Sequence, residues 1–167
     1  MRSILVASAL AILPLSAAAQ DVEAGEKVFG KCKACHMIDD GNQVIVKGNR
    51  TGPNLWNVVG RQVGSMQDFN YGRGLQEIFG KEQIYWDEST LMAYLLDPSA
   101  WVKEVSGDKA LNSKMTFKLK DEKQRADVIA YLRSLSPDAP ALGAMPAAET
   151  ESETEDDDGE DLEGDDD

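Results

Sequence analysis

The apolar positions of the chain follow a helical period in four separate stretches. In the first stretch they recur every four residues after Asp21, whose carboxylate can cap a helix by accepting backbone N–H groups. This face carries Ala24, Val28 and Cys32, with Gly25 and Phe29 on an adjacent face. The pattern predicts a helix that starts at Val22 and runs towards Cys32.

Three further helices are predicted in the second half of the chain. One starts at Asp87 and stops before Pro98, because the residue that precedes a proline is disfavoured in the helical conformation. Pro98 itself opens a short helix towards Val105, since proline fits the first helical turn. The last helix starts near Asp121 and ends near Ser136. Its apolar side carries Val128, Ile129, Leu132 and Leu135, and its water-facing side carries Lys123, Gln124 and Asp127.

The connections between these helices are rich in Gly and Asn and show little of the alternation typical of strands. We expect loops over residues 41–63 and 107–114. The 118 residues from Gln20 to Pro137 suffice for one domain with a small core. The chain is therefore expected to form a single all-α domain over residues 20–137, wrapped around a cofactor that adds apolar volume.

The two ends of the chain differ in composition from this body. Residues 1–19 combine Arg2, an apolar run and an Ala-rich end, which predicts a cleaved signal peptide and a periplasmic protein. Residues 138–167 form a Pro/Ala-rich linker and an acidic tail, which we expect to be disordered. Thirteen of the 30 acidic residues lie within 149–167, so the rest of the chain has 17 acidic and 17 basic residues. This balance gives no indication of nucleic-acid binding, and no apolar run reaches the roughly 20 residues of a membrane span.

Residues 31–36, which read Lys-Cys-Lys-Ala-Cys-His, contain the only two cysteines and the only histidine of the chain. This is the C-x-x-C-H spacing of covalent haem attachment, in which Cys32 and Cys35 form thioethers to the haem vinyl groups and His36 ligates the iron. A zinc site needs about four ligands, and a redox C-x-x-C usually accompanies a βαβ pattern that this sequence does not show. The motif therefore predicts one covalently bound haem c.

The motif does not identify the second axial ligand of the iron. Because the chain has no second histidine, the alternatives are methionine, lysine, the amino terminus, water or no ligand. Met37 adjoins the proximal histidine, Met145 lies towards the tail, and we expect core packing for Met66 and Met92. Met115 follows a long connection and precedes the last helix, where the pattern is compatible with either a ligand or a core residue.

A series of short motifs accompanies C-x-x-C-H in a fixed order. They are Thr51-Gly52-Pro53-Asn54-Leu55, Gly60-Arg61, Trp86, Thr90-Leu91-Met92-Ala93-Tyr94-Leu95, Asp97-Pro98 and Lys114-Met115-Thr116-Phe117. Together they resemble the class I c-type cytochromes, in particular the larger soluble bacterial type called cytochrome c₂. The similarity extends from about residue 22 to residue 135, and it implies the class I cytochrome c fold around one haem.

The resemblance also implies roles for individual residues. Met115 would be the distal iron ligand, and the carbonyl of Pro53 would accept the N–H of His36 and fix the orientation of the imidazole. Tyr94 would hydrogen-bond the methionine sulfur. The other residues of the haem environment would be Arg61, Tyr71 and Trp86 around the propionates, and Ser113 where the family often has threonine.

The function implied by the resemblance is that of a mobile electron carrier, not an enzyme. Its donor would be a cytochrome bc₁-type complex, and its acceptor a terminal oxidase, a photosynthetic reaction centre or a denitrification reductase, with soluble periplasmic reductases or dehydrogenases as further partners. We expect a monomer whose lysines near the haem edge steer it to acidic docking sites. These lysines are Lys31, Lys33, Lys47, Lys103, Lys114, Lys118 and Lys120. The alternatives, a haem-based gas sensor and a small haem peroxidase, both need an open distal site.

Overall fold

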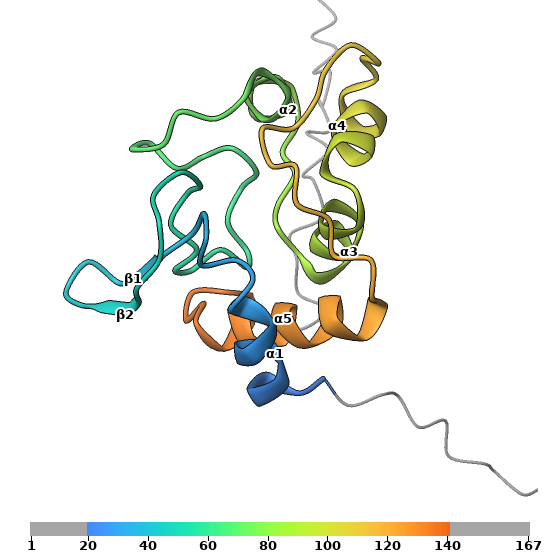
Figure 1. Cartoon of the computed structure of the whole chain (residues 1–167). Helices are drawn as coiled ribbons and strands as arrows, with labels where there is room; N and C mark the ends of the chain where they lie inside the picture. The colour runs from blue at the N-terminus through green and yellow to red at the C-terminus, as the bar shows by residue number, and fades with distance from the viewer. Residues whose placement is uncertain (1–19, 141–167) are drawn as a thin grey trace, which may run out of the picture.

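The computed structural model describes residues 20–140, so the expected signal peptide (1–19) and residues 141–167 of the expected tail lie outside the described residues. The described chain is mostly helical, as predicted, with five helices and one small sheet (Figure 1). The helices are α1 (Val22–Phe29), α2 (Arg73–Lys81), α3 (Glu88–Leu96), α4 (Pro98–Ser106) and α5 (Glu122–Ser134), and the strands are β1 (Ile38–Asp39) and β2 (Val44–Val46). No helix between residues 20 and 140 is long and apolar enough to cross a membrane.

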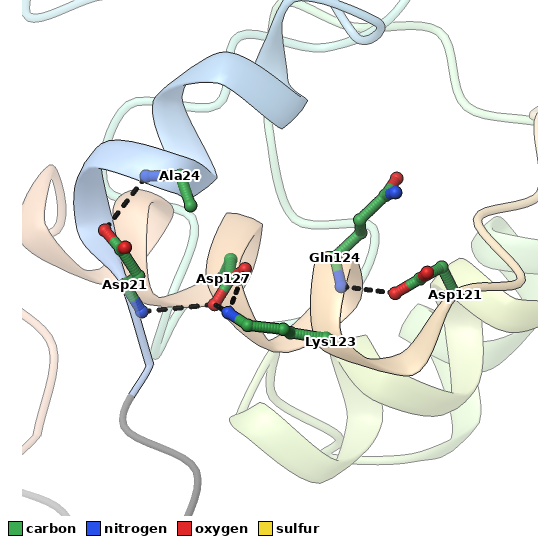
Figure 2. Close-up of polar contacts among 6 residues, drawn as sticks. All are labelled: Asp21, Ala24, Asp121, Lys123, Gln124 and Asp127. Atoms are coloured by element: carbon green, nitrogen blue, oxygen red, sulfur yellow. Dashed lines mark hydrogen bonds and ion pairs between the residues drawn. The ribbon is translucent and has the colours of Figure 1, made fainter.

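Aspartate side chains define the starting points of four helices. Each carboxylate accepts a hydrogen bond from the backbone N–H three residues later, which satisfies an amide that has no partner within the helix. The pairs are Asp21–Ala24, Asp87–Thr90, Asp97–Ala100 and Asp121–Gln124. Figure 2 shows the first and the last of them. These four helices begin within one residue of the predicted positions.

Helices α1 and α5 cross at one end of the domain (Figure 1). The crossing is closest at Gly25, where a Cβ atom would lie 2.0 Å from the backbone oxygen of Asp127. Only glycine therefore fits there without moving one of the helices. Beside it, the rings of Phe29 and Tyr131 pack with their centroids 5.5 Å apart. Aromatic pairs at such distances add to the stability that burial alone provides.

Asp127 is an exception to the predicted water-facing side of α5. Its side chain is buried, with only 4% of the residue exposed. The carboxylate accepts hydrogen bonds from the backbone N–H of Asp21 at 3.1 Å and from Lys123 Nζ at 2.8 Å (Figure 2). The bond from Lys123 is the main cause that lowers the pKa of Asp127. Asp127 thus ties the start of α1 to α5, a role that the helical pattern alone did not indicate.

The first helix also differs from the prediction at its end and in its buried face. It ends at Phe29, and tight turns follow in which the N–H groups of Lys31 and Cys32 donate to the carbonyls of Val28 and Phe29. The buried positions are Gly25 and Phe29, whereas Val28 and Cys32 on the predicted face are half-buried. The C-x-x-C-H motif therefore lies in a turn directly after the helix.

One helix and one hairpin of two strands were not predicted from the sequence. Helix α2 has glycine at two of its nine positions, which obscures the helical pattern that the buried residues Leu75 and Ile78 provide. The hairpin of β1 and β2 is antiparallel, with Ile38 opposite Val46, and it lies partly in the segment predicted as a loop. Its strands are two and three residues long, too short for a visible alternation of apolar and polar side chains.

The body extends slightly beyond the predicted boundary at residue 137. The backbone N–H of Asp138 donates to the side chain of Asn57 at 3.2 Å. Arg133 donates to the carbonyl of Pro140 at 2.5 Å, and the Pro140 ring lies against Gly60. Residues 138–140 therefore pack on the domain and are not part of a separate linker.

Candidate haem site

A cavity of about 340 Å³ lies between these elements. Its wall comes from the turn after α1, the 51–61 loop, residues 69–75, helices α3 and α5, and the segment that precedes α5. All ten residues predicted to bind the cofactor or its metal line this cavity: Cys32, Cys35, His36, Pro53, Arg61, Tyr71, Trp86, Tyr94, Ser113 and Met115. Residues from distant parts of the sequence thus meet around one space.

The imidazole of His36 is held in one orientation. Its Nδ1 lies 2.7 Å from the carbonyl oxygen of Pro53, the contact that the resemblance implied. Because a carbonyl can only accept, Nδ1 carries the proton and Nε2 is left with its lone pair. Burial is the main cause that lowers the pKa of His36, which favours the neutral ring at pH 7. A neutral imidazole with an anchored Nδ1–H is the form that binds a metal.

Gly52 allows this position of the imidazole. A Cβ atom at residue 52 would lie 2.4 Å from Cε1 and 2.7 Å from Nδ1 of His36. Both distances are far shorter than a van der Waals contact, so a larger residue would displace the ring. Gly52 belongs to the Thr51–Leu55 motif, but nothing in the pattern of the chain shows which side chain packs on a loop glycine.

The two cysteines lie in the turn that leads to His36. The N–H groups of Cys35 and His36 both donate to the carbonyl of Cys32, at 3.0 and 2.9 Å. Burial raises the pKa of the Cys32 thiol to about 11, and the neighbouring Cys35 adds to the rise. Cysteines of redox C-x-x-C motifs and metal-binding thiolates instead have lowered pKa values. The sulfur of Cys32 is therefore a protonated thiol at neutral pH and not a thiolate.

A hydrogen-bonded group fixes the segment that carries Met115. The hydroxyl of Ser113 lies 2.8 Å from the hydroxyl of Tyr94 and accepts the backbone N–H of Met115 at 3.1 Å. The resemblance implied a bond from Tyr94 to the methionine sulfur, whereas the hydrogen-bond partner of this hydroxyl in the structure is Ser113. Burial raises the pKa of Tyr94 to about 12, so its hydroxyl is protonated at neutral pH.

Arg61 places a half-buried cation at the cavity. It donates to the carbonyls of Asn54 at 3.1 Å and Trp56 at 3.3 Å, but its Nε is buried without a hydrogen-bond partner among residues 20–140. An unpaired buried N–H is costly, and a carboxylate is the acceptor that matches a guanidinium best. Haem carries two propionate carboxylates, so Arg61 and the apolar cavity both fit this group.

Sequence reasoning did not assign the apolar wall of the cavity. This wall consists of Leu55, Val58, Leu75, Leu91, Leu95, Leu119, Val128 and Leu132. The spacing of four between Leu91 and Leu95 on α3, and between Val128 and Leu132 on α5, does show that they share a helix face. That signal indicates burial but does not distinguish a cofactor cavity from an ordinary core.

Arg125, like Asp127, is a buried charged residue of α5 whose burial the sequence pattern did not indicate. It is 7% exposed and donates to the carbonyls of Leu119 and Lys120, both at 2.8 Å. These bonds attach the segment that follows Met115 to α5. A single arginine on a helix is usually solvated, so the pattern gave no signal for this role.

The seven lysines proposed for docking are not all in one place. Lys31 and Lys114 line the cavity, and Lys118 and Lys120 follow on the same segment as Lys114. The N–H of Asn49 donates to the carbonyl of Lys33, which brings the segment containing Lys47 next to the C-x-x-C-H turn. Lys103 lies in the last turn of α4, outside the segments that line the cavity.

The mainly helical fold and the cavity that gathers C-x-x-C-H, Arg61 and Met115 define a class I c-type haem protein. Comparison with known proteins gives the same result, because the cytochrome c family model matches residues 22–136. This chain belongs to the cytochrome c family and is of the bacterial cytochrome c₂ type. It accordingly carries one covalently attached haem c and is a haem electron carrier.

The relatives are similar over most of their length. Cytochrome c-550 of Paracoccus denitrificans is 48% identical over 155 residues, which cover 90% of this chain and 97% of the relative. Cytochrome c2 of Cereibacter sphaeroides is 40% identical over 139 residues, covering 81% and 95%. The X-ray structure of ferric cytochrome c-550 from Paracoccus versutus aligns with a TM-score of 0.68 and 46% identity, over 71% of this chain and all of that one.

Proposed function

We propose that this protein is a mobile periplasmic electron carrier in which His36 and Met115 would ligate the iron of the haem. The observation that carries the proposal is that both side chains line one cavity together with Cys32 and Cys35. A hydrogen bond to Pro53 holds the imidazole of His36, and a hydrogen bond to Ser113 holds the backbone at Met115. Cys32 and Cys35 would hold the haem through thioether bonds, and the haem would supply an iron that alternates between Fe(II) and Fe(III). His36 and Met115 would together occupy the positions at which a substrate could otherwise bind the iron.

The surrounding residues keep the site rigid and largely dry. Pro53 fixes the ring of His36, and Ser113 with Tyr94 fixes the backbone at Met115. The apolar wall excludes water, and a rigid, dry environment needs little rearrangement when the charge of the site changes. Methionine ligation and burial both favour a comparatively high reduction potential.

Docking to redox complexes is proposed through the lysines at the cavity mouth. Lys31 and Lys114 line the cavity, and Lys118 and Lys120 follow Lys114 in the segment around Met115. A positive surface of this kind increases the rate of encounter with acidic partners and makes it dependent on salt. The proposed donor is a cytochrome bc₁-type complex, and the proposed acceptor is a terminal oxidase, a reaction centre or a denitrification reductase.

A redox titration combined with exposure to carbon monoxide tests this function. We expect the purified holoprotein to titrate as a single one-electron couple, and the reduced form to bind no carbon monoxide. Rapid binding of carbon monoxide would show an open distal site and would favour a gas sensor. Turnover of hydrogen peroxide at a rate well above that of free haem would favour a peroxidase.

A further inference from the structure

Three segments of the described chain border the cavity and carry only positive charge. They are residues 31–36, 47–52 and 113–120, and each contributes residues to the cavity wall. Together they contain seven cationic residues and no carboxylate. We call this set the basic rim: Lys31, Lys33, Lys47, Arg50, Lys114, Lys118 and Lys120.

Most of the basic rim forms no ion pair within residues 20–140. Lys118 is the one member that forms an ion pair there, with Asp97 at 2.6 Å. Lys31 Nζ donates to the amide oxygen of Gln124 at 2.7 Å, and Lys114 Nζ to the carbonyl of Asn70 at 2.9 Å, which are neutral acceptors. The rim is therefore a surface that an acidic partner can neutralise.

The chain itself contains a matching acidic segment. Residues 141–148 carry no charge, and residues 149–167 carry thirteen carboxylates and no cation. The described chain leads to this segment from Pro140, which lies against Gly60, the residue before Arg61 in the chain. Lys120 precedes α5 and Pro140 follows it, so the segment of opposite charge is attached beyond the other end of that 13-residue helix and has to reach back across the domain.

The length of the connection is sufficient for contact. The eight residues from 141 to 148 can span up to about 27 Å when extended, and all 27 residues from 141 to 167 about 90 Å. A folded domain of this size has a radius of gyration of about 14 Å. A tethered segment also acts at an effective concentration of about a millimolar, well above that of most partners.

We propose that residues 149–167 bind the basic rim and compete there with acidic redox partners. The contact is electrostatic, so it weakens as salt screens the charges. It lowers the rate at which the carrier docks at low ionic strength and leaves the haem site unchanged. The contact between tail and rim stands on the charges alone, whereas its effect on docking rests on the proposed function.

Zero-length carbodiimide cross-linking of the full-length holoprotein tests the contact directly. Mass spectrometry is expected to find amide links between the carboxylates of 149–167 and the lysines of the rim, at low salt and not at about 0.5 M salt. Lys27 and Lys109 are exposed and lie outside the three segments, so they serve as internal controls. Links spread equally over rim and control lysines, or no links to the tail, would overturn the proposal.

Two oxidants of opposite charge test the effect of residues 149–167 on docking. In one variant of the full chain, all thirteen carboxylates of 149–167 become amides by Glu→Gln and Asp→Asn. At about 10 mM salt, oxidation by anionic hexacyanoferrate(III) is expected to become about tenfold faster, and oxidation by a cationic cobalt(III) complex slower. Lys114→Gln with Lys120→Gln should reduce this change, while Lys27→Gln with Lys109→Gln should not.

The outcomes separate the two proposals. Competition at the rim is contradicted if the rates with both oxidants change equally. It is also contradicted if the rim and the control lysine substitutions reduce the change by the same amount. If the links form but the iron exchanges electrons with neither oxidant, the contact is supported and the proposed carrier function fails.

Discussion

Gly25 offers the sharpest test of how the domain is closed by α1 and α5. We consider the substitution Gly25→Ala, which adds one methyl group at the crossing. The new Cβ would lie 2.0 Å from the backbone oxygen and 2.6 Å from the carbonyl carbon of Asp127, and 2.8 Å from Cβ of Tyr131. Two of these atoms belong to the backbone of a helix, so no side-chain rotation can relieve the contacts.

Two opposing effects determine the size of the change. Alanine is favoured over glycine in a helix interior by about 1 kcal/mol. Overpacking a tight contact costs about 1–3 kcal/mol, and separating the helices also weakens the Phe29–Tyr131 pair by about 0.5–1.5 kcal/mol. The net expectation is a loss of about 2 kcal/mol, which corresponds to a decrease in Tm of roughly 8 °C for a domain of this size.

The assay is chemical denaturation of the holoprotein followed by far-UV circular dichroism. Gly80→Ala is the matched control, because Gly80 also lies in a helix, α2, and a Cβ there has no atom within 4 Å. We expect this control to raise the stability by up to about 1 kcal/mol through helix propensity alone. The reasoning is refuted if Gly25→Ala equals or exceeds the wild type in stability.

Three further substitutions test the contact between Asp127 and the start of α1, and the haem site. Asp127→Asn removes the ion pair with Lys123. The pKa of Asp127 in the folded protein lies below its ordinary value of 3.8, so the stabilising contribution is complete above that pH and disappears as the pH falls through the folded pKa. The denaturation curves of variant and wild type should therefore differ at pH 7 and converge in acid. Gly52→Ala is expected to displace His36, and the haem content and spectrum of the purified protein should show loss of normal ligation, whereas an unchanged spectrum contradicts the tight packing. Ser113→Ala removes the acceptor of the Met115 amide, whose hydrogen exchange should become about tenfold faster for a bond worth about 1.4 kcal/mol, while Ser113→Thr should preserve the protection.

Much of the fold was predictable because local signals were strong. An aspartate precedes each of the four predicted helices, and capping depends only on neighbouring residues. Helix α2 was missed because Gly74 and Gly80 weaken its local propensity, and it is its packing against α4 that holds the helix in place. The burial of Asp127 also depends on a distant element, the start of α1, which the periodicity of α5 does not report.

The site was predictable for a different reason. The C-x-x-C-H spacing identifies its own chemistry, and the resemblance to a family supplied the distant residues that line the same cavity. The pattern alone did not distinguish Met115 as a ligand from Met115 as a core residue. Nor did it indicate that Tyr94 bonds to Ser113, because the partner of a buried hydroxyl depends on distances of a few tenths of an ångström.

The most direct test of the central claim is the absorption spectrum of the ferric holoprotein in the methionine-to-iron charge-transfer region. We expect this band in the wild type, with low-spin iron, and we expect it in Met66→Leu and Met92→Leu. In Met115→Ala it should disappear, with high-spin iron that binds added ligands and has a lower potential. Absence of the band from the wild type, or its persistence in Met115→Ala, would contradict the assignment of His36 and Met115 as the ligands of an electron carrier.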